Sequence, residues 1–127
     1  MGNSQNLESS NVQCVIDLID RILPSLKDQF ILKKFPNKNQ IFFGISSIGN
    51  KILIEGNDNV SLSYGFNFYL CNFLHFSISW CGNHISEPPT PLPLPSKPIQ
   101  KICKFPYRYY LNNCTHSYSM AFWDWER

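Results

Sequence analysis

Four residues in the middle of the chain have the types and spacing that a metal site needs. Cys71 and His75 are separated by three residues, and Cys81 and His84 by two. Thiolate and imidazole groups are common zinc ligands, and residues four apart share one face of a helix. The spacing differs from the usual zinc-binding patterns. The alternative, which we favour, makes Cys71 a small core residue and His75 the end of a helix, with no metal and no cofactor.

Two further pairs near the C-terminal end have side chains that take part in catalysis elsewhere. Cys114 and His116 would share one face of a strand, but no third group is apparent that would orient the histidine. Asp124 and Glu126 lie in an aromatic cluster, and glycoside cleavage needs two carboxylates that face each other. Residues two apart on a helix point in different directions, so these acids do not form that pair. No catalytic residue is assigned.

Aromatic residues make up 15% of the 127-residue chain. Their rings could stack on sugars while Asn side chains bind the hydroxyl groups, but composition alone favours an ordinary core. The net charge is +2, with 11 basic and 9 acidic residues spread along the chain, so neither nucleic acid nor an anionic membrane is an expected partner. The chain has no apolar run of about 20 residues, so we expect no membrane-spanning helix. Its first residues lack the pattern of a signal peptide, so we expect no secretory signal there.

The first predicted element is an amphipathic helix. Apolar residues recur at three- and four-residue steps from Val12 to Leu26, and Ser10 with Gln13 reads as a capping box at the start. Pro24 should bend or end this helix, because proline lacks the N–H that the helix needs. Short runs rich in branched and aromatic residues then predict strands at residues 30–32, 40–45 and 51–55, with turns at 36–39 and 49–50.

A second helix is predicted after residues 56–59, which can end the preceding strand and cap the helix. Its buried side is expected to use Val60, Tyr64, Phe68 and Cys71, with Leu62, Phe66, Tyr69, Leu70 and Phe73 beside it. This helix is apolar on most sides, so we expect it to lie between a sheet and another layer. Residues 77–80 alternate as one more strand, and the prolines of residues 87–98 require an extended chain.

These elements predict a mixed α/β (α+β) fold in which two helices lie on a short sheet. We expect residues 1–10 to be a disordered leader, 11–86 the α/β domain, 87–98 a Pro-rich linker, and 99–127 the beginning of a larger domain. Residues 99–127 are too few to enclose a core of their own.

Residues 107–127 carry the pattern Y-R-Y-Y-x-N-x-C-T-x-S-Y-S-x-x-x-W-D-W. This pattern resembles the start of the catalytic barrel in alpha-N-acetylglucosaminidases of glycoside hydrolase family 89. Upstream, the spacing of Gly56, Val60, Gly65 and Tyr69-Leu70, then Ser79-Trp80-x-Gly82 and the Pro-Leu-Pro segment, is similar to the N-terminal domain of that family. The resemblance covers roughly residues 10–127.

The resemblance implies an N-terminal α/β domain followed by the truncated start of a TIM-type barrel. It also implies a retaining exoglycosidase that removes terminal alpha-linked N-acetylglucosamine from heparan sulfate with two glutamates. Those glutamates belong to later barrel strands, so this chain alone is expected to be inactive and to lack its catalytic barrel. The motif places Asn112, Cys114 and Tyr118 in substrate binding. The family further implies a lysosomal or secreted enzyme. The alternative function is a non-catalytic glycan-binding or packing module.

Overall fold

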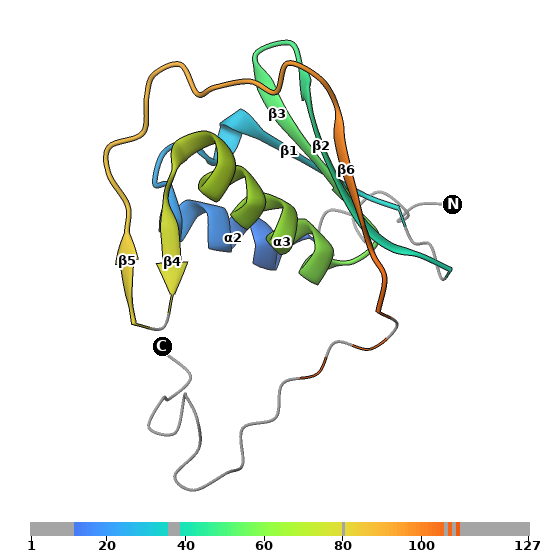
Figure 1. Ribbon diagram of the computed structural model, residues 1–127. Coiled ribbons are helices and arrows are strands. Elements are labelled where there is room, and N and C mark those ends of the chain that lie inside the picture. Colours follow the sequence, from blue (N-terminus) through green and yellow to red (C-terminus); the bar gives the residue numbers. More distant parts are fainter. Residues whose placement is uncertain (1–11, 36–38, 80, 106, 108, 110–127) are drawn as a thin grey trace, which may run out of the picture.

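Two helices pack on one face of a four-stranded sheet, and a short hairpin stands beside them (Figure 1). The elements are α2 (Gln13–Ile22), η1 (Lys27–Gln29), β1 (Phe30–Lys34), β2 (Ile41–Ile48), β3 (Lys51–Gly56), α3 (Asn59–Tyr69), η2 (Leu70–Leu74), β4 (Ser77–Ser79), β5 (Gly82–His84) and β6 (Ile99–Cys103). The sheet has the order β1-β3-β2-β6, and β4 pairs with β5. The computed structural model describes residues 12–35, 39–79, 81–105, 107 and 109.

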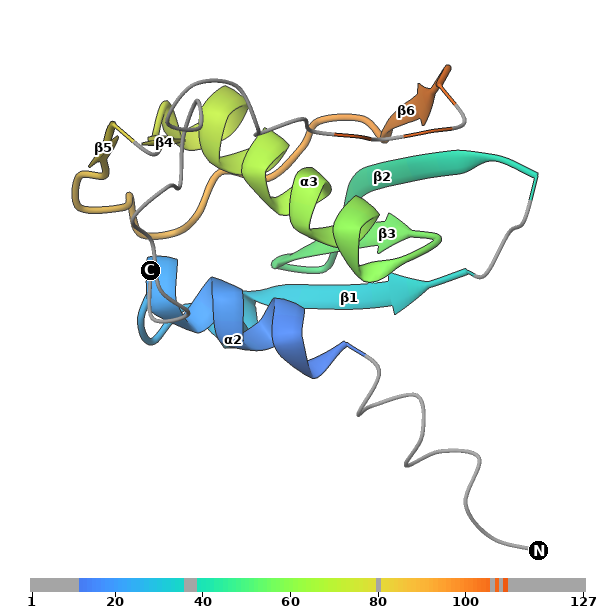
Figure 2. The same ribbon diagram turned by 90° about the horizontal axis from the view of Figure 1, so that it is seen from below.

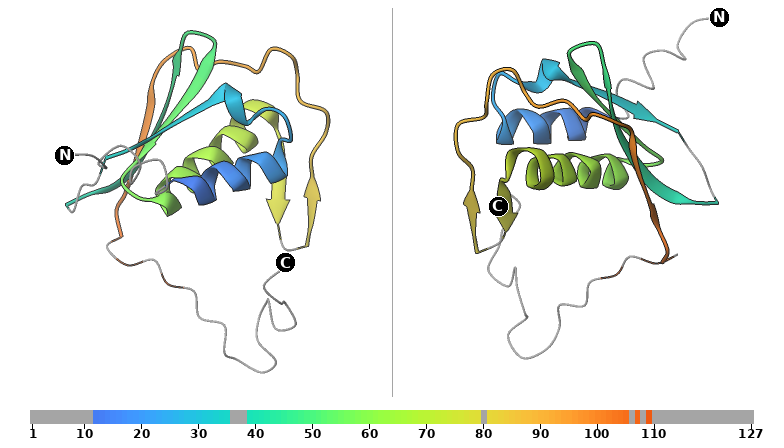
Figure 3. Two further views of the ribbon diagram at one scale, coloured as in Figure 1. Left: turned by 180° about the vertical axis from the view of Figure 1, so that it is seen from behind. Right: turned by 45° about the horizontal axis from the view of Figure 1, so that its top comes forward.

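The first helix, α2, confirms the predicted amphipathic pattern. Val15, Ile19 and Leu23 are buried in the core that the helices share with the sheet. The helix ends at Ile22, because Pro24 follows two residues later and cannot continue the hydrogen-bond ladder. Figures 2 and 3 show α2 lying beside α3 on the same face of the sheet. The sequence therefore predicts both the period and the end of this helix correctly.

The start of α2 differs from the predicted capping box. Val12 is the residue that precedes the first helical turn, and it makes no side-chain capping bond. Gln13 is the first helical residue, and its amide donates to Asp17 Oδ1 at 2.8 Å. In a capping box this glutamine would stand at the third helical position. Ser10, the other half of the prediction, lies outside the described residues.

Alternate residues of the sheet point toward the helices. β1 pairs in parallel with β3, whereas β2 pairs antiparallel with both β3 and β6. In this register Phe30 lies beside Ile52, and Ile45 beside Ile54. All four side chains are buried in the core. The three predicted strands are thus confirmed, and each continues past its predicted end.

The start of α3 is fixed by side chains of the preceding loop. Asp58 Oδ1 accepts a hydrogen bond from the Ser61 backbone N–H at 2.6 Å, which confirms the predicted cap. Asn57 Oδ1 accepts from the Phe42 backbone N–H at 3.1 Å and from Ser61 Oγ at 3.0 Å. A single amide therefore ties the first turn of α3 to the start of β2.

One glycine sets the distance between α3 and the sheet. A Cβ atom at Gly65 would lie 2.8 Å from Ile54 Cγ2 and 3.3 Å from Phe43 Cδ2. Both neighbours are buried, and both belong to strands of the sheet. The helix approaches the sheet this closely because residue 65 has no side chain.

The buried side of α3 differs from the one predicted. Val60 and Tyr64 are each 60% exposed, Cys71 is also exposed, and Phe68 is partly buried. The buried residues of this helix are Ser61, Leu62, Gly65, Phe66 and Tyr69. The prediction is wrong for Val60, Tyr64 and Cys71, whereas the residues expected beside them include four that are buried: Leu62, Phe66, Tyr69 and Leu70. A helix packs closest along its small residues, and here those are Ser61 and Gly65.

α3 widens at its end into one turn of π-helix, η2, which stops at His75. His75 has a φ of 57°, a left-handed conformation that breaks the helix. The chain then forms the β4–β5 hairpin, in which Ser79 lies opposite Gly82. The strand predicted at residues 77–80 is confirmed over Ser77–Ser79, and residue 80 lies outside the described residues.

The Pro-rich segment packs on the domain instead of leaving it. Leu92 is buried in the core, and the Tyr69 hydroxyl donates to the Pro93 carbonyl at 2.9 Å. The segment leads to β6, which pairs with β2 at the edge of the same sheet. The sequence predicts that residues 99–127 begin the next domain, whereas β6 belongs to the sheet of the first. A proline-rich extended segment has the composition of a linker, but here it also buries Leu92 in the core. The other predicted boundaries stay predictions.

Gly65→Ala should destabilise the domain. The added methyl group meets Ile54 Cγ2, so we expect the free energy of unfolding to fall by about 1–3 kcal/mol. This cost outweighs the gain of about 1 kcal/mol in helix propensity. Urea unfolding measures the difference. The control is Asn67→Ala on the exposed side of the same helix, which should be neutral or slightly stabilising. A Gly65→Ala variant as stable as the parent would contradict this close approach.

Tyr69→Phe removes the hydroxyl that holds Pro93 and should lower the free energy of unfolding at neutral pH by about 1 kcal/mol. Burial raises the pKa of the Tyr69 phenol above its ordinary value. The unfolded chain therefore ionises first, and the native protein loses stability as the pH rises above about 10. Phenylalanine cannot ionise, so the deficit of the variant should shrink above that pH.

Denaturant unfolding of both proteins at about pH 7 and about pH 11 measures this change, because these values lie on either side of the ordinary tyrosine pKa. Tyr64→Phe is the matched control, since Tyr64 lies on the same helix and is 60% exposed. It should change stability by less than about 0.5 kcal/mol at either pH. A Tyr69→Phe deficit that stays constant with pH would argue against a buried phenol.

Candidate functional site

The residues that the family motif assigns to substrate binding belong to the C-terminal part of the chain. Asn112, Cys114 and Tyr118 all lie outside the described residues. The Cys114–His116 pair and the two acids at 124 and 126 lie there as well. Their roles therefore stay predictions.

The four residues of the possible metal site do not meet in the structure. Cys71, His75, Cys81 and His84 are all exposed, and the described part of the chain holds no cluster of three or more His, Cys, Asp or Glu residues. His75 ends the helix, as the favoured alternative predicts. The same alternative is wrong about Cys71, which is exposed instead of buried. Of the helices in the described ranges, none has the length and apolar character needed to cross a bilayer.

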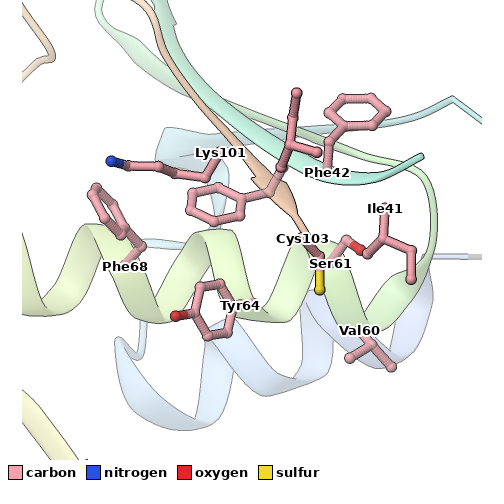
Figure 4. Close-up of a pocket in the computed structure, with 10 residues that line it drawn as sticks. Ile41, Phe42, Val60, Ser61, Tyr64, Phe68, Lys101 and Cys103 are labelled. Atoms are coloured by element: carbon pink, nitrogen blue, oxygen red, sulfur yellow. The ribbon is translucent and has the colours of Figure 1, made fainter. Parts of the chain in front are cut away.

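The described residues instead form an apolar groove between α3 and the β6 edge of the sheet (Figure 4). Its volume is about 410 Å³. β2 contributes Ile41, Phe42 and Phe43, α3 contributes Val60, Ser61, Tyr64 and Phe68, and β6 contributes Lys101, Ile102 and Cys103. Lys101 is the only charged residue in this lining.

The spacing of residues on α3 and the register of β6 together build the groove. Val60, Tyr64 and Phe68 are four residues apart, so they stand above one another on one side of the helix. On the strand side, Lys101 pairs with Phe43, and Cys103 pairs with Ile41. Paired residues of an antiparallel ladder point to the same face of a sheet. Lys101 and Cys103 therefore lie on the face of the sheet that α3 covers, together with their β2 partners Phe43 and Ile41.

Ring contacts hold the floor of the groove. The Phe43 ring lies 5.3 Å from the Tyr64 ring and 5.4 Å from the Phe68 ring, measured between centroids. Figure 4 shows the Lys101 side chain extending toward Phe68. At the far end, the Cys103 thiol donates to the Phe105 carbonyl at 3.3 Å. These contacts leave the outer sides of Val60 and Tyr64 exposed to solvent.

The side chains that line this groove are mostly apolar. The lining has no carboxylate and no imidazole, and its polar side chains are Ser61, Tyr64, Lys101 and Cys103. Apolar side chains and rings favour an apolar partner. The sequence does not predict the groove, because it predicts neither strand β6 nor which side of α3 is buried. The signal it does contain is a second helix without a polar side.

Residues 13–94 match the family model described as the alpha-N-acetylglucosaminidase (NAGLU) N-terminal domain. The alpha-N-acetylglucosaminidase of Homo sapiens is 35% identical to this chain over 79 residues. That match covers 61% of this chain and 10% of the human protein. The chain thus spans about one tenth of the human relative that it matches.

Solved structures of a family 89 glycoside hydrolase from Clostridium perfringens also match, with a TM-score of 0.84 and 32% sequence identity. The match covers 98% of this chain and 14% of that enzyme chain. One of these structures is a complex with PUGNAc. Another is a variant with two glutamates replaced by glutamine, in complex with its substrate GlcNAc-alpha-1,4-galactose. The two-helix, mixed α/β fold is therefore shared with the N-terminal part of that enzyme.

Proposed function

Because this chain belongs to the family of alpha-N-acetylglucosaminidase N-terminal domains, we propose that it is the non-catalytic leading domain of a glycosidase. The complete enzyme would remove terminal alpha-linked N-acetylglucosamine from heparan sulfate. The observation that carries this proposal is the match to the Clostridium perfringens enzyme, whose fold and sequence both agree across nearly the whole chain. That enzyme binds a glycan that ends in alpha-linked N-acetylglucosamine.

The described residues support a structural role for this domain in such an enzyme. Retaining glycosidases need two carboxyl groups about 5–5.5 Å apart across the sugar. The lining of the groove has no Asp or Glu, and the described residues contain no group of three or more acidic, His or Cys side chains. The two catalytic glutamates would come from the barrel that follows in the complete enzyme.

The residues that follow the sheet would contribute to the sugar pocket. By the family motif, Asn112, Cys114 and Tyr118 stand in the first βα unit of the barrel, where residues at the C-terminal ends of strands face the substrate. We assign them to substrate binding on that ground. The family also supports a lysosomal or secreted location for the complete enzyme.

The isolated chain of residues 1–127 should not hydrolyse an aryl alpha-N-acetylglucosaminide, because it would lack both glutamates. The complete protein encoded beyond the Arg127 codon should hydrolyse it. Release of the aryl group, measured against a blank without protein, tests both statements. Turnover by the isolated chain above that blank would overturn the assignment of catalysis to the barrel.

Binding without cleavage is the alternative, and calorimetry separates the two functions. The isolated chain titrated with N-acetylglucosamine and with a heparan sulfate fragment should give no heat of binding at millimolar ligand, because its sugar pocket would be incomplete. A clear binding isotherm would favour a free-standing glycan-binding module.

A further inference from the structure

The Pro-rich segment is held to the domain by few contacts. Residues 85–98 run from β5 to β6 and form neither helix nor strand (Figure 1). The prolines of this segment have no N–H to donate. Among the described residues, the bond from the Tyr69 hydroxyl to the Pro93 carbonyl is the only hydrogen bond between this segment and the rest of the chain. Its only buried side chains are Leu92 and Pro95.

β6, which follows this segment, is also peripheral. It pairs with β2 alone, at the edge of the sheet. None of its five residues is buried, and the three central ones are exposed. β3 is the contrast, because it pairs with a strand on each side and buries Ile52 and Ile54 completely, at 0% exposure. The backbone ladder to β2 is therefore the main attachment of β6, whereas β3 is held by the whole core.

Parts of a protein with few buried apolar contacts open at a lower free energy than its core. We propose, independently of the function given above, that residues 85–103 form a strap that opens as one unit while the rest of the domain stays folded. Leu92 is its latch, together with the hydrogen bond between Tyr69 and Pro93. Proline-rich chain is stiff over several residues, so a movement at Leu92 is transmitted to β6.

Opening of the strap changes where the following part of the chain is attached. In the closed state, the residues beyond Cys103 start at the edge of β2. In the open state they are tethered at the β4–β5 hairpin, and the extended strap reaches roughly 60 Å, since each residue spans about 3.3 Å. The latch at Leu92 therefore sets the position of whatever follows β6 along the chain.

Native-state hydrogen exchange of residues 1–127 in low concentrations of urea tests this device. The β6 amides that bond to β2 should exchange at least about tenfold faster than the amides of β3. Their exchange should also depend less on urea, because opening the strap exposes less surface than unfolding the whole domain. Equal rates and equal urea dependence in the two strands would overturn the proposal.

Two alanine variants separate the strap from the core. Leu92→Ala should speed exchange in both β6 and β3 by at least about tenfold, because Leu92 leaves the core in the open strap and in the unfolded chain alike. Val15→Ala on α2 should speed exchange in β3 by a similar factor but leave β6 within about twofold, because Val15 stays buried when only the strap opens. A Val15→Ala variant that speeds both strands equally would show that the strap does not open alone.

Leu94→Ala is the matched control, since Leu94 lies in the same segment and is 39% exposed. It should change the exchange of either strand by less than about threefold. Tyr69→Phe removes only the hydrogen bond and should speed exchange in both strands about fivefold, so it replaces Leu92→Ala if that variant does not fold. Fast β6 exchange that responds to neither variant would mean that the strand frays by itself, and the latch would be excluded.

Discussion

The approach of α3 to the sheet at Gly65 decides the arrangement of the whole domain. Ile54 and Phe43 occupy the space where a side chain at this position would lie, so the helix has one orientation about its axis. That orientation turns Leu62 and Phe66 into the core and turns Val60 outward. The groove beside β6 therefore depends on the missing side chain at Gly65, whose close neighbour Phe43 also lines that groove.

Both ends of α3 are held so that this orientation is maintained. At its start, the Asn57 side chain binds β2, and Asp58 caps the first turn. At its end, Tyr69 lies in a group of rings: its centroid is 5.5 Å from that of Phe30 and 5.2 Å from that of Phe73. Such ring pairs contribute about 0.5–1.5 kcal/mol beyond their burial. The Tyr69 hydroxyl also donates a hydrogen bond to the Pro93 carbonyl, which fixes the Pro-rich segment to the end of α3.

The sequence predicts those elements whose signals are local. The period of α2, the strands at 30–32 and 51–55, and the Asp58 cap each depend on residues that are close in sequence, and the structure confirms them. The side of α3 that is buried depends on a contact between Gly65 and Ile54, which no pattern within the helix reveals. β6 depends on pairing with the distant β2, and its five residues show no clear alternation of buried and exposed positions. The groove needs both features, so it could not be predicted. The assignment of Asn112, Cys114 and Tyr118 rests on the family motif alone.

The position of β6 determines when the sheet can be completed during synthesis of the chain. The sheet receives its edge strand from the far end of the chain, after the helices, the hairpin and the Pro-rich segment. As the chain leaves the ribosome, β2 and β3 can pair at once, whereas the other edge of β2 must wait until Ile99 arrives beside Ile45. An open strand edge is a template for pairing with other chains. A protease cut in the Pro-rich segment, or a pause in synthesis there, would therefore leave a nearly complete core in which one edge of β2 is unpaired and open to other chains.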